Sequence, residues 1–360
     1  MALNTSLHSA KKAKNDEFYT QLPDIERELR HYADQLRDKV ILCNCDDPFE
    51  SNFFKYFAMN FNRLGLKKLI AICYYPSPVA GKQLTLFEVK PPLRKGISKS
   101  TKAAYKIEIT EVKDKDNSGG INLADVEYLL KYSGNALTLL EGDGDFRSDE
   151  CIELLKEADI VVTNPPFSLF REYVAQLFEY NKKFVIIGSK NAITYKEIFM
   201  LIKENKLWLG HGFKGGNAYF SVPNPRDFAS GVYDEKTGLV KFRNLGWYTN
   251  LTVNRSEDPI VPYIKYEDGV KRGLYPKYDN YDAIEVSKVA EIPVDYYGAM
   301  GVPITFLDKW VPPALIERER EREEFAILGL DRYIKGNTMP NRRMFVNNKE
   351  IYARIIIKRI

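Results

Sequence analysis

Short apolar runs alternate with helix-patterned segments between residues 39 and 189, and this alternation constrains the fold more than any other feature of the chain. The apolar runs are rich in Val, Ile and Leu, as buried strands are, and read KVILCNC, KKLIAICYY, DIVVTNPPF and KKFVIIGS. Amphipathic segments such as FFKYFAMNFNRLG and LFREYVAQLFEYN separate these runs. Parallel strands need long crossover connections, which are usually helices. The alternation therefore predicts an α/β fold on a mostly parallel, doubly wound sheet.

The same periodicities predict the remaining elements and the division of the chain. Helices are expected over 22–36, 124–132, 149–158 and 314–323, strands over 105–112 and 350–360, and a hairpin over 239–253. From about residue 211 the alternation ends, and Gly, Pro, Asn and aromatic residues become frequent. We therefore expect a flexible basic tail (1–14), a main domain (15–210) with a basic insertion at about 76–120, and an irregular α+β region (211–360).

Positive charge collects in three segments, although the formal net charge is only +4. One lies near the N-terminus, and the second is the acid-free stretch PPLRKGISKSTKAAYK. The third holds Arg342, Arg343, Lys349, Arg354, Lys358 and Arg359. A solvated surface explains any one of these segments, whereas contact with phosphates explains the three together better.

The cysteines and histidines do not indicate a metal site. We predict that all four cysteines are reduced and structural, since they lack zinc-site spacing: Cys43, Cys45, Cys73 and Cys151. The three histidines are too scattered to suggest a metal cluster or a catalytic triad. No apolar run approaches the roughly 20 residues of a membrane-spanning helix, and no signal peptide is evident, so we expect a cytoplasmic protein.

The tetrapeptide Asn164–Phe167 forms a stiff polar corner directly after the apolar run DIVV. Proline fixes φ near −65° and pushes the preceding residue toward extended conformations, so Asn-Pro-Pro has few shapes available. In open parallel sheets, ligands bind at the carboxyl ends of strands, where this corner is expected. By itself the sequence NPP is more often a simple turn, but its position after a buried strand and before an aromatic favours a functional site.

The corner offers two hydrogen-bond acceptors and a flat apolar ring. The acceptors are the side-chain oxygen of Asn164 and the carbonyl of Pro165, and the ring is that of Phe167. An exocyclic adenine amine has two N–H donors on a planar ring, so it matches this set in hydrogen bonding and in shape. Fixed acceptors also help localise the nitrogen lone pair for attack on a methyl sulfonium, and they stabilise the positive charge that grows on nitrogen.

At these residues the chain resembles a known family. The NPPF motif is similar to the catalytic motif of amino-group methyltransferases that use S-adenosylmethionine, and the whole chain resembles the EcoRI-type adenine-specific DNA methyltransferases. The segments that carry the resemblance are NDEFYT, CNCDDP, SNFFKYF, GDGDFRS, NPPF, WYTNL, GVPITFLDKW and YARIIIKR. The resemblance implies a Rossmann-like methyltransferase sheet and extends over most of the chain.

The resemblance also implies roles for individual residues. Asn164, Pro165 and Pro166 would form the catalytic corner that holds the target amine, and Phe167 would stack on the extruded base. The segment Phe18, Tyr19 and Thr20 would close over the methionine end of S-adenosylmethionine. The cofactor would further contact Asn44, Cys45, Asp46, Asp47, Asp145 and Phe146, with Asp145 accepting from the cofactor adenine amine and Phe146 packing on its ring.

The chain departs from the family pattern at two places. The loop CNCDDPFESN lacks the usual glycines, so Asp46 and Asp47 become candidates for binding the methionine ammonium, with a capping or turn role equally open. The second strand ends in Cys73, Tyr74 and Tyr75 and lacks the acid that usually binds the cofactor ribose.

The partner implied is double-stranded DNA, from which the target adenine must be extruded. The domain 15–210 would bind the cofactor, and region 211–360 would recognise the target and contact DNA. Tyr219 and Phe220 are candidates for a second stacking face or for ordinary core residues, and the candidates for guanine recognition are Arg226, Arg243 and Arg255. A monomer paired with a restriction endonuclease is expected. The alternatives are an RNA adenine-N6 or protein glutamine methyltransferase, and an inactive DNA-binding relative.

Overall fold

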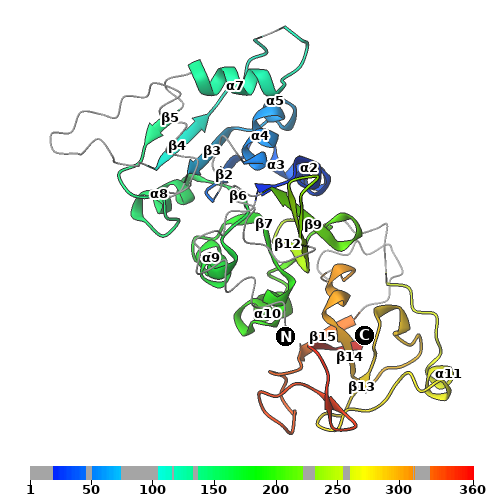
Figure 1. Cartoon of the computed structure of the whole chain (residues 1–360). Helices are drawn as coiled ribbons and strands as arrows, with labels where there is room; N and C mark the ends of the chain where they lie inside the picture. Colours follow the sequence, from blue (N-terminus) through cyan, green and yellow to red (C-terminus); the bar gives the residue numbers. More distant parts are fainter. Residues whose placement is uncertain are drawn as a thin grey trace. The chain divides into compact units, whose positions relative to one another are not determined.

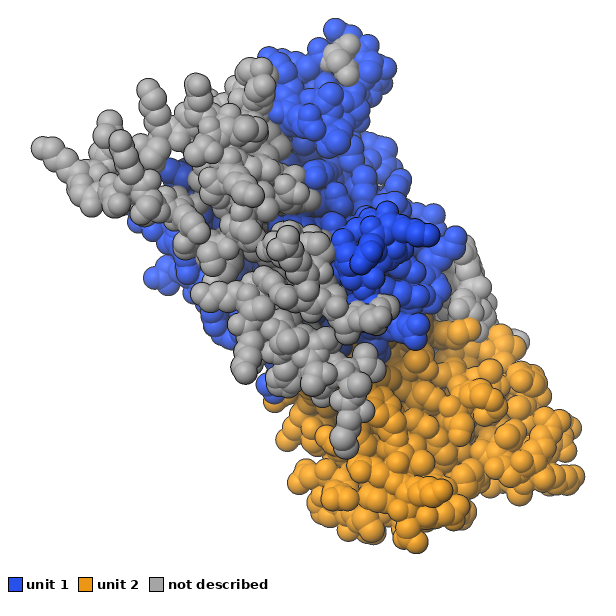
Figure 2. Space-filling view, in the orientation of Figure 1, with its two compact units in different colours: residues 1–189, 212–251 blue, residues 190–211, 252–360 orange. Residues whose placement is uncertain are grey.

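The computed structural model divides the chain into two compact units. It describes residues 19–45, 51–73, 104–115, 117–132, 137–221, 232–253, 260–310, 312 and 325–360. The first unit comprises residues 1–189 and 212–251, and the second comprises residues 190–211 and 252–360 (Figure 2). Residues 212–251 thus fold with the first unit, which differs from the expected boundary at 210. The predicted tail 1–14 and the predicted helix 314–323 lie outside the described residues.

The first unit begins with the predicted helix over 22–36, which forms in three pieces. These are α2 (Leu22–Leu29), the 3-10 turn η1 (Arg30–Tyr32) and α3 (Ala33–Leu36). Glu28 is fully buried in this segment, where a carboxylate needs hydrogen-bond donors. The Tyr32 hydroxyl donates to it at 2.8 Å and the Gly212 N–H at 2.9 Å. Glu28 therefore ties the N-terminal helix to the start of segment 212–251.

A mixed sheet forms the centre of the first unit (Figure 1). The first unit contributes to it the strands β2 (Val40–Cys43), β3 (Lys68–Cys73), β4 (Tyr105–Ile109), β5 (Leu137–Leu139), β6 (Ile160–Thr163), β7 (Lys183–Ser189) and β12 (Leu245–Thr249), in the order β5-β4-β3-β2-β6-β7-β12. The neighbours β3, β2, β6 and β7 are parallel, whereas β4, β5 and β12 pair antiparallel. The prediction of a mostly parallel sheet therefore holds for the centre only, because the flanking strands run the opposite way.

Helices connect the parallel strands, as the alternation predicted. They are α4 (Asn52–Met59) and α5 (Phe61–Leu64) between β2 and β3, α7 (Leu123–Tyr132) and α8 (Asp149–Glu157) before β6, and α9 (Phe170–Glu179) between β6 and β7. The hydroxyl of Ser51 caps α4 by accepting from the N–H of Phe53. Gly65 ends α5 in the left-handed conformation, at φ 62°. Local capping signals thus set the limits of this crossover.

A second, antiparallel sheet in the first unit contains β1 (Tyr19–Thr20), β9 (Asn217–Ser221), β11 (Leu239–Arg243) and β10 (Tyr233–Asp234), in the order β1-β9-β11-β10. The predicted hairpin over 239–253 is wrong, because β11 joins this sheet and β12 joins the central one. Asn244 lies between the two strands at φ 68° and redirects the chain. All residues of β12 are buried, which suits a strand covered on both faces and not an exposed hairpin.

The second unit combines short helices with small sheets. A four-stranded sheet combines β13 (Ile284–Glu285), β14 (Met300–Pro303), β18 (Arg354–Arg359) and β15 (Phe325–Leu330), in the order β13-β14-β18-β15. Strand β18 confirms the predicted C-terminal strand. The other elements are η3 (Lys190–Thr194), α10 (Lys196–Lys203), β8 (Trp208–Leu209), α11 (Tyr266–Lys271), η6 (Val289–Glu291), η7 (Ile304–Asp308), β16 (Phe345–Val346) and β17 (Lys349–Glu350). Among the described residues, no helix is long and apolar enough to cross a membrane.

Candidate active site

The predicted catalytic corner lies where the strand order of the central sheet reverses. After β2, the chain adds β3 on one side of β2 and later adds β6 on the other. Asn44 and Asn164 follow the carboxyl ends of β2 and β6, so they emerge from adjacent parallel strands. The N–H of Cys45 donates to Oγ1 of Thr163 at 3.2 Å, which joins the two strand ends. Such a reversal is the usual ligand site of an open α/β sheet.

The Asn164–Phe167 corner leads directly into a helix. Pro165 is buried, whereas Asn164, Pro166 and Phe167 are half-buried. The carbonyl of Pro166 accepts from the N–H of Leu169 at 3.0 Å, which starts the 3-10 turn η2 (Phe167–Leu169) before α9. The corner is therefore held between the buried strand β6 and an amphipathic helix whose inner face is buried, which restricts the direction of its polar groups.

Tyr173 on α9 connects the corner to the end of β2. Its hydroxyl donates to Oδ1 of Asn44 at 2.5 Å, and both residues are almost fully buried. The only other hydrogen bond of this amide within the described residues comes from Sγ of Cys45 and also goes to Oδ1. Among the described residues, no acceptor therefore engages either N–H of the Asn44 amide.

The ring of Tyr173 also positions Phe146, which the resemblance assigns to the cofactor adenine. The two rings meet edge to face, with centroids 5.0 Å apart and an interplanar angle of 73°. Nε2 of Gln176, one turn further along α9, donates to the carbonyl of Phe146 at 3.0 Å. One helix thus holds both Asn44 and Phe146, two residues that the sequence places about a hundred positions apart.

Asp145 is paired with Arg147 in the structure. Nη2 of Arg147 lies 2.6 Å from Oδ2 of Asp145, and Nε donates to Oδ1 at 2.8 Å. These hydrogen bonds hold the pKa of the Asp145 carboxyl below its usual value, against the opposing effect of burial. The Arg147 guanidinium also lies over the ring of Phe146, 5.3 Å from its centroid. Arg147 therefore contacts both residues of the predicted adenine subsite, Asp145 and Phe146.

Thr20 lies beside the beginning of α4. Its carbonyl accepts from Nδ2 of Asn52, the first residue of α4, at 2.7 Å. The Thr20 side chain is buried, and its Oγ1 has no hydrogen-bond partner among the described residues. A buried hydroxyl in this state needs a further polar partner. The other predicted residues of this region, Phe18, Asp46 and Asp47, lie outside the described residues.

Comparison with known proteins identifies the family of this chain. A family model described as adenine-specific methyltransferase EcoRI matches residues 6–360. The chain belongs to the EcoRI-type adenine-specific methyltransferases. This assignment confirms the family resemblance and the prediction of an adenine-specific methyltransferase.

Three relatives of this methyltransferase match almost end to end. Type II methyltransferase M.EcoRI of Escherichia coli is 44% identical over 360 residues, covering 99% of this chain and 97% of the relative. Type II methyltransferase M.MpnI of Mycoplasma pneumoniae is 35% identical, covering 97% of this chain and 96% of the relative. Type II methyltransferase M.MgeORF184P of Mycoplasma genitalium is 34% identical and covers 97% of each chain. No solved structure matches.

The two aromatic residues of β9 that were predicted to stack, Tyr219 and Phe220, lie in different environments in this methyltransferase. Phe220 is fully buried and packs edge to face on Phe242, with centroids 5.6 Å apart. A ring without exposed surface does not meet an extruded base, so Phe220 takes the alternative core role. Tyr219 is exposed, with Nζ of Lys241 5.8 Å from its ring centroid, and remains a candidate for stacking.

The predicted C-terminal cationic segment of the methyltransferase is partly internal. Arg354 forms hydrogen bonds with the buried Glu285, with Nη2 2.6 Å from Oε1. Arg359 is buried and donates to the carbonyl of Pro293 at 2.7 Å. The prediction that these two arginines contact phosphates is therefore wrong. Arg342, Lys349 and Lys358 are exposed and remain candidates for such contacts. Of the predicted guanine readers, Arg243 is exposed, and Arg226 and Arg255 lie outside the described residues.

The cysteines of the methyltransferase are free thiols, as predicted. Burial raises the pKa of Cys151 to about 11, so this thiol stays protonated at neutral pH. Within the described ranges, no group of three His, Cys, Asp or Glu residues is placed to hold a metal ion.

Tyr173 and Arg147 are the site residues that sequence reasoning missed. Tyr173 occupies an apolar position of an amphipathic helix, where the sequence pattern is that of an ordinary core residue. A tyrosine at such a position needs a partner for its hydroxyl, and this requirement was the one available signal.

Proposed function

We propose that this methyltransferase transfers a methyl group from S-adenosylmethionine to the N6 amine of adenine at specific sites in duplex DNA. The observation that carries the proposal is the position of the Asn164–Phe167 corner at the strand reversal, beside Asn44. We also infer a doubly wound, Rossmann-like arrangement. The parallel centre, the reversed strand order and the helical crossovers between its strands support it.

The residues at the strand ends fit the cofactor chemically. S-adenosylmethionine supplies an electrophilic methyl group on a sulfonium, together with a carboxylate, an ammonium and ribose hydroxyls. Asn44 has both amide N–H donors available for the carboxylate or a ribose hydroxyl, and the buried hydroxyl of Thr20 needs a polar partner. The carboxylate of Asp145 stays ionised beside Arg147 and can accept from the adenine amine.

The corner residues prepare the target amine. The side-chain oxygen of Asn164 and the carbonyl of Pro165 would accept its two hydrogens, which directs the nitrogen lone pair away from the base plane. Because both acceptors are fixed before the reaction, they stabilise the positive charge that develops on nitrogen without reorganising. The half-buried ring of Phe167 offers one stacking face for an extruded adenine.

The substrate assignment rests on the named relatives. Type II methyltransferases act beside restriction endonucleases, and relatives with that name cover this chain almost completely. We therefore propose duplex DNA as the substrate and a restriction endonuclease as the functional counterpart. A monomer in the cytoplasm is proposed with it.

Transfer of tritium from labelled S-adenosylmethionine tests this function. The purified chain is incubated with duplex DNA, with RNA and with protein extract, and the modified DNA is then digested to nucleosides. We expect label in duplex DNA as N6-methyladenine. Label in RNA or protein alone would replace the proposal with one of the alternatives, and no saturable cofactor binding by calorimetry would identify an inactive relative.

A further inference from the structure

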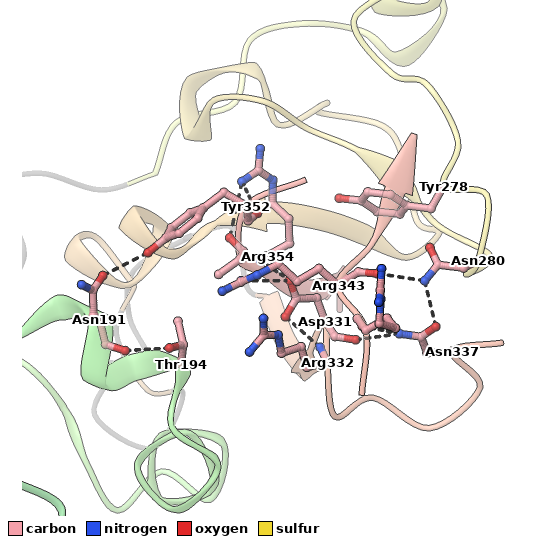
Figure 3. A network of polar contacts seen from close by, with 12 residues as sticks. Asn191, Thr194, Tyr278, Asn280, Asp331, Arg332, Asn337, Arg343, Tyr352 and Arg354 are labelled. Atoms are coloured by element: carbon pink, nitrogen blue, oxygen red, sulfur yellow. Dashed lines mark hydrogen bonds and ion pairs between the residues drawn. The ribbon is translucent and has the colours of Figure 1, made fainter. Parts of the chain in front are cut away.

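A buried asparagine in the second unit holds an exposed loop in one shape. Asn337 is buried, and its Nδ2 donates to the carbonyls of Asp331 and Arg342, each at 3.0 Å (Figure 3). Its Oδ1 accepts from the N–H of Met339 at 2.8 Å. The Asn337 side chain therefore joins the backbone at Asp331 to the backbone at Arg342, the two ends of the exposed loop.

A second buried asparagine completes this clamp. Nδ2 of Asn280 donates to Oδ1 of Asn337 at 2.9 Å and to the carbonyl of Arg343 at 3.0 Å (Figure 3). Its Oδ1 accepts from the N–H of Phe345 at 3.0 Å, and its own carbonyl accepts from the N–H of Thr338, also at 3.0 Å. Amide hydrogen bonds between buried groups cannot be exchanged for water without a penalty, so the loop is rigid.

The hairpin that follows is pinned in the same way. Strands β16 and β17 are joined by Asn347 and Asn348, both at positive φ (50° and 61°), as a tight two-residue turn requires. The carboxylate of Asp279 accepts from the N–H of Asn347 at 3.3 Å and from the N–H of Asn348 at 2.8 Å. Residues 279 and 280 thus hold the whole stretch 338–349, which is named the pinned segment.

The pinned segment presents donors and amides to solvent without any acidic residue. Its exposed residues are Thr338, Met339, Pro340, Asn341, Arg342, Asn347, Asn348 and Lys349. The guanidinium of Arg342 lies over the ring of Phe345, 5.6 Å from its centroid. No hydrogen bond or ion pair engages that guanidinium among the described residues, unlike the internally paired Arg354. The N–H groups at its edge are therefore available to a ligand.

Exposed guanidinium and amide groups on a rigid frame are the chemistry that reads bases in the major groove. Arginine donates bidentately to guanine, and asparagine pairs with adenine, whereas a site for phosphates alone needs only cations. Rigidity lowers the entropic cost of ordering such a surface on binding. We propose that the pinned segment is a DNA-reading surface in which Arg342 donates to a base edge. This inference rests on the proposed function.

Binding of two Arg342 variants to DNA tests the proposal. Sequencing the adenines methylated by the wild-type chain first defines a target, from which a fluorescein-labelled duplex and singly substituted duplexes are made. By fluorescence anisotropy, Arg342→Ala is expected to weaken binding to the target about 10-fold or more. Arg342→Lys keeps the charge but loses the planar guanidinium. Its affinity for the substituted duplexes should equal that of the wild type. The ratio of its affinities for the target and for a substituted duplex should be several-fold smaller than the wild-type ratio.

The matched control is Arg272→Ala, which removes an exposed arginine at the end of α11 in the same unit. Affinity of Arg342→Ala within twofold of that control would overturn the proposal, and so would full discrimination by Arg342→Lys. Failure of the wild-type chain to methylate any adenine in duplex DNA would instead refute the proposed function. Unchanged melting temperatures of all three variants establish that they are folded.

Discussion

The hydroxyl of Tyr173 donates to Oδ1 of Asn44 at 2.5 Å, although the two residues are 129 positions apart. This bond sets the orientation of the Asn44 amide, whose N–H donors no described residue engages and which we propose to bind the cofactor. Tyr173→Phe should therefore weaken S-adenosylmethionine binding about 5-fold to 10-fold, as expected for one hydrogen bond together with the freed amide. Calorimetry measures the affinity, and kcat at saturating cofactor should change less than KM for the cofactor.

The control is Tyr180→Phe, at the C-terminal end of the same helix, where the ring lies 6.0 Å from Nζ of Lys156. Equal effects of the two substitutions, or a loss confined to kcat in Tyr173→Phe, would argue against a positioning role for Tyr173.

The pair between Asp145 and Arg147 predicts a pH-dependent contribution to stability. Because the folded-state pKa of Asp145 is lowered, the pair stabilises the fold above the unfolded pKa of the carboxyl, and this stability is lost as the pH falls through the folded pKa. Arg147 is half-exposed, so Arg147→Gln should lower the free energy of unfolding at pH 7 by less than about 1 kcal/mol. In urea titrations at decreasing pH, the difference in free energy of unfolding between Arg147→Gln and the wild type should become smaller. A difference that grows toward acid pH would contradict a stabilising pair between Asp145 and Arg147.

Gly188 on β7 leaves room for the first residue of α9. A Cβ at this position would lie 2.4 Å from Cε2 of Phe170, so either the ring or the strand would have to move. Gly188→Ala should lower the free energy of unfolding by about 1–3 kcal/mol, the usual range for an overpacked core. Urea denaturation measures the change. Gly142→Ala, with no atom within 4 Å of the added Cβ, serves as the control, and equal stability of both variants would refute the close packing.

The central sheet was predictable because its strands are continuous apolar runs with helical segments between them. Order along the chain then placed Asn164 after a buried strand, where its corner was expected. The hairpin prediction failed because period-2 patterning does not say which sheet a strand joins. Asn244 redirects the chain between β11 and β12, but only the neighbours of each strand reveal that they belong to different sheets.

Pairings between distant residues were not predictable from the sequence. Phe220 and Tyr219 are adjacent in an alternating strand, and nothing local determines which of them faces the core. Arg354 and Arg342 lie in the same basic segment, yet only Arg354 meets a buried carboxylate, that of Glu285, 69 positions away. Charge density in a sequence therefore overestimates the number of cations that are available to DNA.

Arg354 should contribute to stability and not to DNA binding. Arg354→Ala leaves Glu285 buried without its partner, which is expected to cost about 3–5 kcal/mol in the free energy of unfolding of the second unit. The exposed Lys358 on the same strand provides the control, and Lys358→Ala should change stability by less than about 0.5 kcal/mol. Chemical denaturation compares the two, and similar values for both would contradict a buried ion pair.

Asn164 is the central catalytic residue of the proposed reaction, because its side-chain oxygen is proposed to hold the target amine. Asn164→Ala should lower the single-turnover rate of methyl transfer to duplex DNA by about 100-fold or more, the usual effect of removing one preorganised polar group. Affinities for S-adenosylmethionine and for the duplex should change little, because Asn44 and the DNA contacts remain. A rate near that of the wild type, or a loss of rate matched by an equal loss of binding, would contradict the catalytic role of the corner.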